Sequence, residues 1–66
     1  MKFKELKKVL SCFDIFEICM HNDLKSTSFF ANYDSIDETA KLHRLDDKEV
    51  LYITAIDEKF LYISLK

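Results

Sequence analysis

Two cysteines and two histidines are the side chains of this sequence that could bind a soft metal or act in nucleophilic catalysis: Cys12, Cys19, His21 and His43. Structural zinc sites place such ligands in pairs about two to four residues apart on a tight turn. Only Cys19 and His21 are that close, and they would share one face of a strand. A cysteine nucleophile also needs a base, an orienting group and an oxyanion pocket, and no residue pattern indicates them. We therefore predict no metal, no other cofactor, no catalytic residue and a protein that is not an enzyme.

Carboxylates in the middle of the chain form the second group with potential chemistry. They are Asp34, Asp37, Glu38, Asp46, Asp47 and Glu49. A calcium loop of the EF-hand type needs a glycine at its sharp turn, and this sequence contains no glycine. The same lack excludes the glycine-rich phosphate-binding loops of nucleotide-binding proteins. Solvated turn and helix-end positions explain most of these carboxylates, and the alternative is an acidic patch for a basic partner, formed by Asp46, Asp47 and Glu49.

Lysines near the N-terminus are the basic counterpart and indicate an alternative function. A basic surface with interleaved aromatic rings can bind nucleic acid through phosphate contacts and base stacking. The net charge of −2, from ten basic and twelve acidic residues, is unlike that of a typical phosphate-backbone binder. Phe3 also falls at helical spacing with Leu6 and Leu10, as a core residue would. Nucleic-acid binding or regulation through a Lys-rich N-terminal helix therefore remains the alternative, with Lys2, Lys4, Lys7 and Lys8 as its basic residues.

The length and composition restrict the class of protein. A chain of 66 residues that is 48% hydrophobic and 33% charged is typical of one small globular domain, which we place at 1–66. No apolar run of secretory or membrane-spanning length is present in the sequence. We therefore expect a cytoplasmic protein with reduced cysteines and no membrane partner.

Hydrophobic periodicity predicts the elements of the first two thirds of the chain. Apolar residues at helical spacing indicate a helix over 2–13, and alternation predicts strands over 15–21 and about 25–33 with a turn at Asn22-Asp23. Which of Phe29 and Phe30 faces the core is left open. Ser35 and Glu38 match a capping box, which favours a short helix over 36–43, and a structured loop is the alternative.

The last twenty residues predict a β-hairpin, with strands over 49–56 and 59–65 around Asp57-Glu58. A sheet with one solvated face normally alternates apolar and polar residues, but here both faces are largely apolar. The expected inner face carries Leu51, Ile53, Ala55, Leu61, Ile63 and Leu65. The expected outer face carries Val50, Tyr52, Thr54, Ile56, Phe60, Tyr62 and Ser64.

Together these elements predict an α+β fold in the order α-β-β-(α)-β-β. The N-terminal helix would pack on one face of a mostly antiparallel sheet of about four strands. The expected core comprises Leu6, Val9, Leu10, Phe13, Phe16, Ile18, Leu51, Ile53, Leu61 and Ile63.

The outer face of the C-terminal hairpin is the predicted partner-binding surface. A single helix can cover only one face of the sheet, and the segment between the hairpins is short. The outer face is then either additional core or an interface, and large apolar patches with tyrosine are typical of interfaces. We expect a protein partner or a second copy of the chain, as a homodimer, to cover Tyr52, Ile56, Phe60 and Tyr62.

Several segments resemble a loose class of small uncharacterised proteins encoded by phages and mobile elements of low-GC Gram-positive bacteria. They are the "KELKKVL" opening, the acidic "SIDE" stretch and the final "LDDKEVLYITAIDEKFLYISL". The matching residues are Leu6, Leu10, 45–50, 55–57, Leu61 and Ile63. That class has no agreed activity, so the resemblance transfers no catalytic residue. It implies a setting in which short proteins often act by binding host proteins, including components of antiviral defence.

The residues therefore predict a small non-enzymatic protein–protein interaction module. The resemblance alone implies its finer form, an inhibitor of a bacterial host defence protein.

Overall fold

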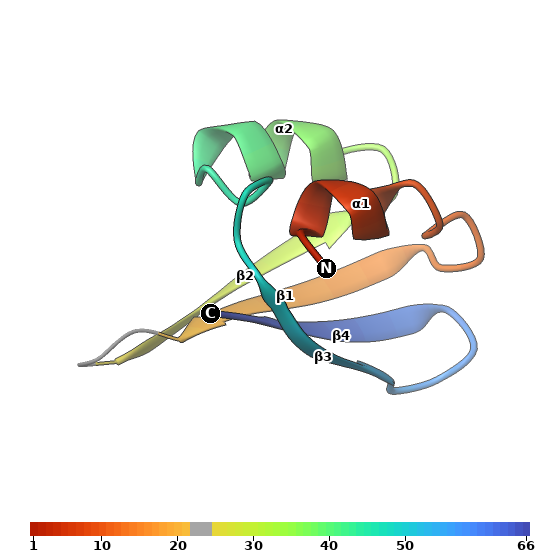
Figure 1. Cartoon of the computed structure of the whole chain (residues 1–66). Coiled ribbons are helices and arrows are strands. Elements are labelled where there is room, and N and C mark those ends of the chain that lie inside the picture. The colour runs from red at the N-terminus through yellow and green to blue at the C-terminus, as the bar shows by residue number, and fades with distance from the viewer. Residues whose placement is uncertain (22–24) are drawn as a thin grey trace.

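The computed structural model describes residues 1–21 and 25–66, and it places two short helices on one side of a four-stranded sheet (Figure 1). The elements in chain order are α1 (Phe3–Lys7), β1 (Ile15–His21), β2 (Ser26–Asn32), α2 (Ile36–Leu42), β3 (Val50–Ala55) and β4 (Phe60–Leu65). The predicted α+β class and element order are confirmed. The predicted turn at Asn22-Asp23 lies outside the described residues.

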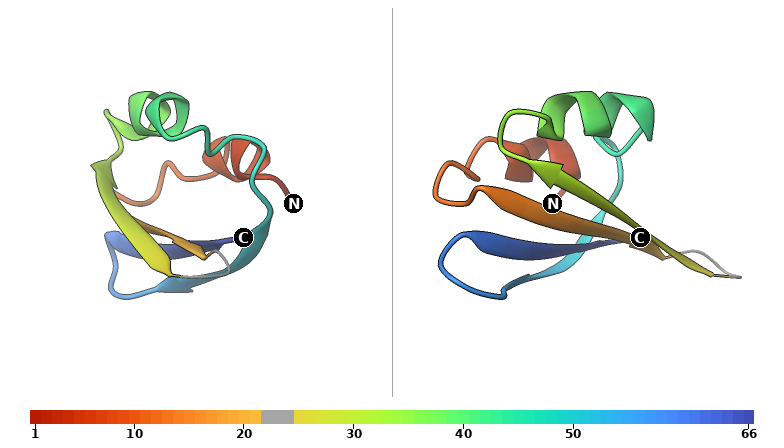
Figure 2. Two further views of the ribbon diagram at one scale, coloured as in Figure 1. Left: turned by 90° about the vertical axis from the view of Figure 1, so that its left-hand side faces the viewer. Right: turned by 180° about the vertical axis from the view of Figure 1, so that it is seen from behind.

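Two hairpins side by side form the sheet, in the strand order β2-β1-β4-β3 (Figure 2). Strands within each hairpin are antiparallel, as predicted. The first and last strands of the chain are the central pair, and they run parallel from Ile15 opposite Phe60 to Met20 opposite Leu65. The sheet is therefore mixed, with β2 and β3 as its two edges.

Both helices cover the same face of the sheet, and the core lies between them and the central strands. The sequence predicted cover from the N-terminal helix alone. In the structure α2 contributes two buried residues as well, Ile36 and Ala40. The central strands supply the other wall of the core, through Phe16, Ile18, Leu61, Ile63 and Leu65. No helix in the described part of the chain is long and apolar enough to cross a membrane.

The N-terminal helix is shorter than predicted. It ends at Lys7, and the chain continues in turns in which the Val9 N–H donates to the Leu6 carbonyl and the Phe13 N–H to that of Leu10. Leu6 and Leu10 are buried as expected, but Val9 is 67% exposed. Turns of three residues bring Leu10 and Phe13 back toward the sheet at nearly helical spacing, so the apolar pattern alone could not distinguish them from a helix.

A register shift in β3 changes which residues of the last hairpin face the helices. The shift lies between Val50 and Tyr52, so Val50 pairs with Leu65 on the helix side. The prediction for these positions was therefore wrong: Val50 packs against the core, whereas Leu51 is 50% exposed. Ile53 does lie on the helix-side face, opposite Ile63, but it stays half exposed because the core lies over the central strands and β3 is an edge.

The segment after β2 forms a helix, which resolves the choice between helix and loop, but its start differs from the predicted capping box. The Ser35 side chain makes no capping bond to the helix. Instead, Ser35 Oγ accepts a bond from the Asn32 N–H (3.1 Å), and the Ser35 N–H donates to Asn32 Oδ1 (2.8 Å). This reciprocal pair fixes the turn that leads from β2 into α2.

The end of α2 has the bonding of a Schellman motif. The Leu45 N–H donates to the Ala40 carbonyl (2.8 Å), and the Arg44 N–H donates to that of Lys41 (3.4 Å). Arg44 occupies the left-handed position of this motif, with φ 56°, where glycine is the usual residue. Leu45 follows it into the core, where both Leu45 and Ala40 are fully buried.

Arg44→Gly is expected to stabilise the protein. Removing Cβ relieves the left-handed strain, of about 1–2 kcal/mol, while the freer unfolded chain offsets part of the gain. We expect the free energy of unfolding to rise by ~0.5–1 kcal/mol in urea denaturation. The control is Glu38→Gly inside α2, which should lower it by ~1 kcal/mol. Equal losses for the two variants would contradict the assigned role of Arg44.

Candidate functional site

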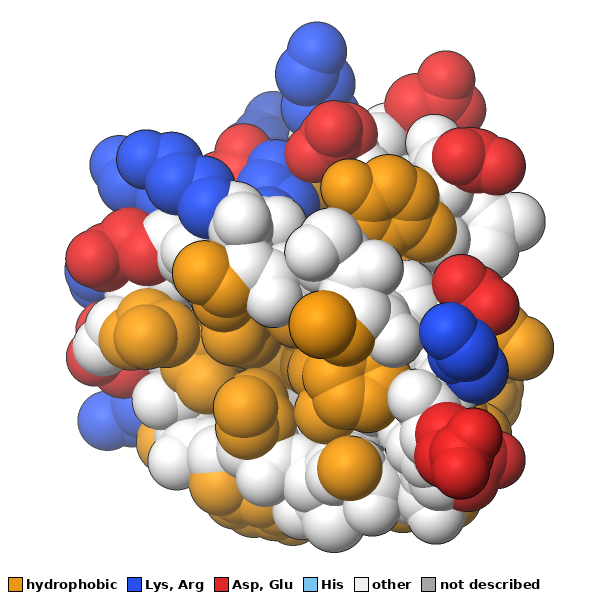
Figure 3. All heavy atoms as spheres, turned by 90° about the vertical axis from the view of Figure 1, so that its right-hand side faces the viewer, with side chains coloured by type: hydrophobic (Ala, Val, Ile, Leu, Met, Phe, Trp, Pro, Cys, Tyr) orange, Lys and Arg blue, Asp and Glu red, His pale blue; other side chains and the backbone are white. Residues whose placement is uncertain are grey.

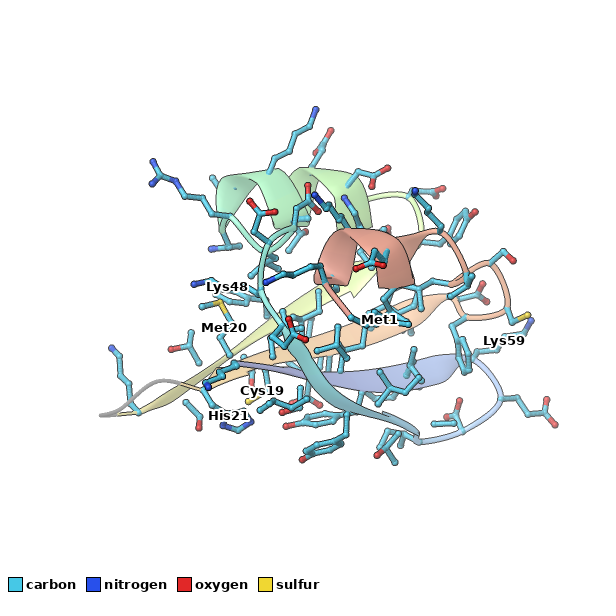
Figure 4. The ribbon with its side chains drawn as sticks, viewed as in Figure 1. Met1, Cys19, Met20, His21, Lys48 and Lys59 are labelled. Atoms are coloured by element: carbon cyan, nitrogen blue, oxygen red, sulfur yellow. The ribbon has the colours of Figure 1, made fainter. Side chains whose placement is uncertain are left out.

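The face of the sheet opposite the helices carries the predicted partner-binding residues. Cys19 and His21 of β1 point to this side, and Met20 points to the helices (Figure 4). Because cross-strand partners share a face, the pairing places all of the following residues on this open face of the sheet. They are Ile15, Glu17, Cys19, His21, Ser28, Phe30, Tyr52, Thr54, Phe60, Tyr62 and Ser64.

Two tyrosines and two small residues form a compact group on the open face. Tyr52 lies opposite Ser64, and Ser64 lies opposite Cys19 on the next strand. The rings of Tyr52 and Tyr62 are 6.0 Å apart between centroids. Although no helix among the described residues covers them, Ser64 and Cys19 are buried. We attribute this burial to the tyrosine rings, which lean over side chains too short to reach past them.

The Tyr62 hydroxyl is held in its neutral form. Hydrogen bonding to Cys19 is the main cause, and partial burial and the neighbouring Tyr52 act in the same direction, so the pKa of Tyr62 is raised above its ordinary value. The Ser64 hydroxyl oxygen, also buried, has no hydrogen-bond partner among the described residues. Cys19 and the Ser64 hydroxyl are thus screened from water on the open face.

The other end of the open face is apolar. Ile56 follows β3, and its N–H donates to the Phe60 carbonyl (2.8 Å). Ile56 is 56% exposed and Tyr52 is 54% exposed, whereas Phe60 and Tyr62 are half-buried. Figure 3 shows hydrophobic side chains over the middle of the end where β3 joins β4, with charged side chains above them and at both flanks. The four predicted apolar residues therefore lie on one continuous side of the sheet.

Two further residues enlarge this surface, and neither was predicted as a binding residue. Phe30 is 67% exposed opposite Glu17, and Ile15 is exposed opposite Phe60. The choice between the two adjacent phenylalanines is settled by the pairing of Phe29 with Ile18 on the helix side. Phe29 packs there against the core and stacks on the His43 ring, with centroids 3.8 Å apart. The alternation of side chains along β2 was the available signal. It does not show which of the two faces of β2 lies on the same side as the core residues of β1.

The acidic residues predicted at the binding surface lie elsewhere, against the N-terminal segment. Asp46 Oδ1 is 2.7 Å from Lys7 Nζ, and Asp47 Oδ1 is 3.6 Å from Lys4 Nζ. Glu49 contacts the terminal amino group of Met1 (3.0 Å) and Lys2 Nζ (3.3 Å). Backbone hydrogen bonds join the same two segments. The Phe3 N–H donates to the Lys48 carbonyl, the Lys4 N–H to the Asp46 carbonyl and the Val50 N–H to the Met1 carbonyl.

Lys7 is the most buried partner in these ion pairs. Its side chain is 15% exposed and also reaches Asp37 Oδ1 of α2 (3.2 Å), so it joins α1, α2 and the segment before β3. Burial opposes its charge, but the hydrogen bonds and charges of Asp46 and Asp37 outweigh that effect and raise the pKa of Lys7. At Glu49, the hydrogen bond from the terminal ammonium is the main cause of a lowered pKa.

The remaining candidate residues for chemistry are dispersed. Cys12 is exposed in the connection after α1, and Cys19 is buried. His21 Nδ1 is 2.9 Å from Ser26 Oγ, whereas His43 is on the opposite side of the sheet beside Phe29. Within residues 1–21 and 25–66, no group of three or more His, Cys, Asp or Glu side chains is placed to hold a metal ion, and the described surface has no pocket.

Comparisons with protein-family models, with curated proteins and with solved structures find no match to this chain. The site is therefore interpreted from its own geometry.

Cys19→Ala is expected to bring the titration of Tyr62 closer to that of an ordinary tyrosine. The raised pKa means that Tyr62 stabilises the fold fully below its ordinary value of 10.0, and this contribution is lost as the pH rises through the raised value. Tyrosinate absorbance against pH measures the titration, and Tyr62→Phe identifies which step belongs to Tyr62. Indistinguishable curves for wild type and Cys19→Ala would contradict the proposed role of the thiol.

Lys7→Met is expected to destabilise the protein by ~1–2 kcal/mol, because the half-buried Asp46 loses its cation. Urea denaturation measures the loss, and Asp46→Asn in the same chain should restore part of it. Lys4→Met is the matched control, since its pair with Asp47 is solvent-exposed and should contribute no more than ~0.5 kcal/mol. Equal losses for the two lysine variants would show that burial does not distinguish these pairs.

Proposed function

We propose that this protein is a non-enzymatic binding module that recognises a folded protein through the open face of its sheet. The observation that carries the proposal is the exposed apolar surface on that face. It combines Tyr52, Ile56 and Phe30 with the half-buried Phe60 and Tyr62. Interfaces are enriched in aromatic side chains of this kind and depleted of charge at their centres.

The distribution of charge supports the same proposal. The ion pairs from the N-terminal segment are made on the helix side and at the nearby edge, whereas Glu17 is the one acidic residue that the strand pairing places in the centre of the open face. A partner with an uncharged, apolar patch would therefore dock here without leaving many charges buried and unpaired. A single lysine or arginine at the rim of the partner could match Glu17.

The nucleic-acid alternative receives less support from the geometry. Lys2, Lys4 and Lys7 each contact a carboxylate of the same chain. A phosphate backbone would have to compete with these internal anions for the lysines. The finer proposal, that the partner is a component of bacterial antiviral defence and that the gene belongs to a phage or mobile element, is supported only by the resemblance of the sequence.

The combined variant Tyr52→Ala and Ile56→Ser tests the binding surface. Affinity capture from a bacterial lysate, followed by calorimetric titration of the purified captured protein, measures binding. Truncation of a tyrosine at the centre of an interface costs about 2 kcal/mol, so we expect affinity to fall by ~30-fold or more.

Leu42→Ser is the matched control for that experiment. It removes an exposed apolar side chain from α2 on the other side of the molecule, and should leave the affinity unchanged. Circular dichroism of each variant checks that the fold is retained. Binding that survives the open-face variant, or a nucleic-acid affinity that is lost in Lys4→Glu with Lys8→Glu, would contradict the proposal.

A further inference from the structure

We propose that the open face binds an arginine side chain of its protein partner, with the guanidinium on Glu17 and the rings of Phe30 and Tyr62 on either side of it. This inference rests on the proposed function, because it names the group of the partner that the face would recognise. It concerns Glu17, whereas the apolar residues Tyr52 and Ile56 test the binding surface as a whole. The two proposals can therefore fail separately.

Glu17 is a half-buried carboxylate in the centre of the open face. It belongs to β1, one of the two central strands, and the pairing places it opposite Phe30 of β2 and Tyr62 of β4. No cation among the described residues forms an ion pair with Glu17. A charged group that is partly removed from water is stabilised when a counterion accompanies it. A partner that covers this face would therefore bind best if it supplied a cation at this point.

Aromatic rings flank this carboxylate on both neighbouring strands. Adjacent strands lie about 4.8 Å apart, so a group bound at Glu17 is within reach of both rings. Phe30 is 67% exposed and presents its ring to solvent. The Tyr62 hydroxyl is hydrogen-bonded to Cys19, the next residue on this face of β1, so the ring extends from β4 toward β1. The negative faces of such rings attract a cation placed over them.

The chemistry of this site favours arginine over lysine. A guanidinium group is planar, stacks on aromatic rings and can donate two parallel hydrogen bonds to one carboxylate. It is also weakly hydrated, so it loses little on a surface that is mostly apolar. A lysine ammonium is a compact and strongly hydrated charge, and it would give up more of its hydration in the same place.

The charge at the adjoining end of the sheet also favours a basic partner. The Lys59 carbonyl accepts bonds from the N–H groups of Asp14 and Ile15, so the start of β1 lies beside the turn between β3 and β4. This end carries Asp14, Asp57 and Glu58, and none of these carboxylates makes an ion pair within the described residues. The carboxylates next to the N-terminal segment, by contrast, are paired with cations. The charge around the open face therefore complements an arginine and opposes a phosphate.

Titration with the capped tripeptide acetyl-Ala-Arg-Ala-amide, followed by the backbone amide signals in nuclear magnetic resonance, tests the site. We expect saturable shifts at Glu17, Phe30 and Tyr62, with a dissociation constant on the order of 10 mM for so small a ligand. The lysine peptide acetyl-Ala-Lys-Ala-amide should bind at least about threefold more weakly.

Glu17→Gln is the decisive variant, because it keeps the size of the side chain and removes its charge. It should weaken binding of the arginine peptide at least about tenfold. Phe30→Ser should weaken binding about threefold, through loss of one ring. Glu58→Gln is the matched control, since it removes the same charge from the exposed turn and should change the affinity less than about twofold at physiological salt. The amide spectrum of each variant checks that the fold is retained.

An arginine peptide that causes no saturable shifts at these three residues would overturn the proposal. So would a Glu17→Gln variant that binds the peptide as tightly as wild type does, or a lysine peptide that binds as tightly as the arginine peptide. For the captured protein partner, an affinity that falls in Tyr52→Ala with Ile56→Ser but is unchanged in Glu17→Gln would refute only the arginine inference. Peptide binding by a protein whose partner affinity survives Tyr52→Ala with Ile56→Ser would support the arginine site and contradict the proposed function.

Discussion

The parallel pairing of β1 with β4 is the contact on which the rest of the structure depends. Each hairpin alone would be a two-stranded sheet, which is only marginally stable in water. Their central strands carry the fully buried Phe16, Ile18, Ile63 and Leu65, and these residues meet because the strands are neighbours. A parallel pair cannot be closed by a tight turn. The chain between β1 and β4 must therefore cross over the sheet, and this crossover includes α2, which covers part of the core.

The two faces of the sheet differ in how they are covered. The helices and turns cover one side of the central strands, and no helix in the described part of the chain lies on the other side. Cys19 and Ser64 are nevertheless buried on the open face, next to Tyr52 and Tyr62, and we attribute their burial to these rings. Yet this cover leaves aromatic carbon at the surface. The need to shield the sheet and the proposed role of this face in binding thus have the same structural origin.

Ion pairs also help to hold this small fold together. The N-terminal segment docks through the buried Phe3 and Leu6, and it is also joined to the segment before β3 by backbone hydrogen bonds and by ion pairs. Lys7 is the central member because it is largely buried between two carboxylates. In the sequence the lysines and the carboxylates read as two separate charged regions, each a candidate interface. In the folded chain they mainly neutralise one another, which leaves the open face as the stronger candidate.

The sequence by itself determined the two hairpins and the alternation of most strand residues, because alternation and turn chemistry act between near neighbours. That was enough to bring Tyr52, Ile56, Phe60 and Tyr62 to one side. The sequence left open whether the segment 36–43 is a helix or a loop, and the structure decided for the helix α2. Only the tertiary structure decided that β1 and β4 are parallel neighbours and that α1 ends at Lys7. It also decided the register shift in β3 that turns Val50 toward the core and leaves Leu51 exposed. These features depend on contacts between distant segments that compete for one small core, and a local pattern satisfies several such arrangements equally well.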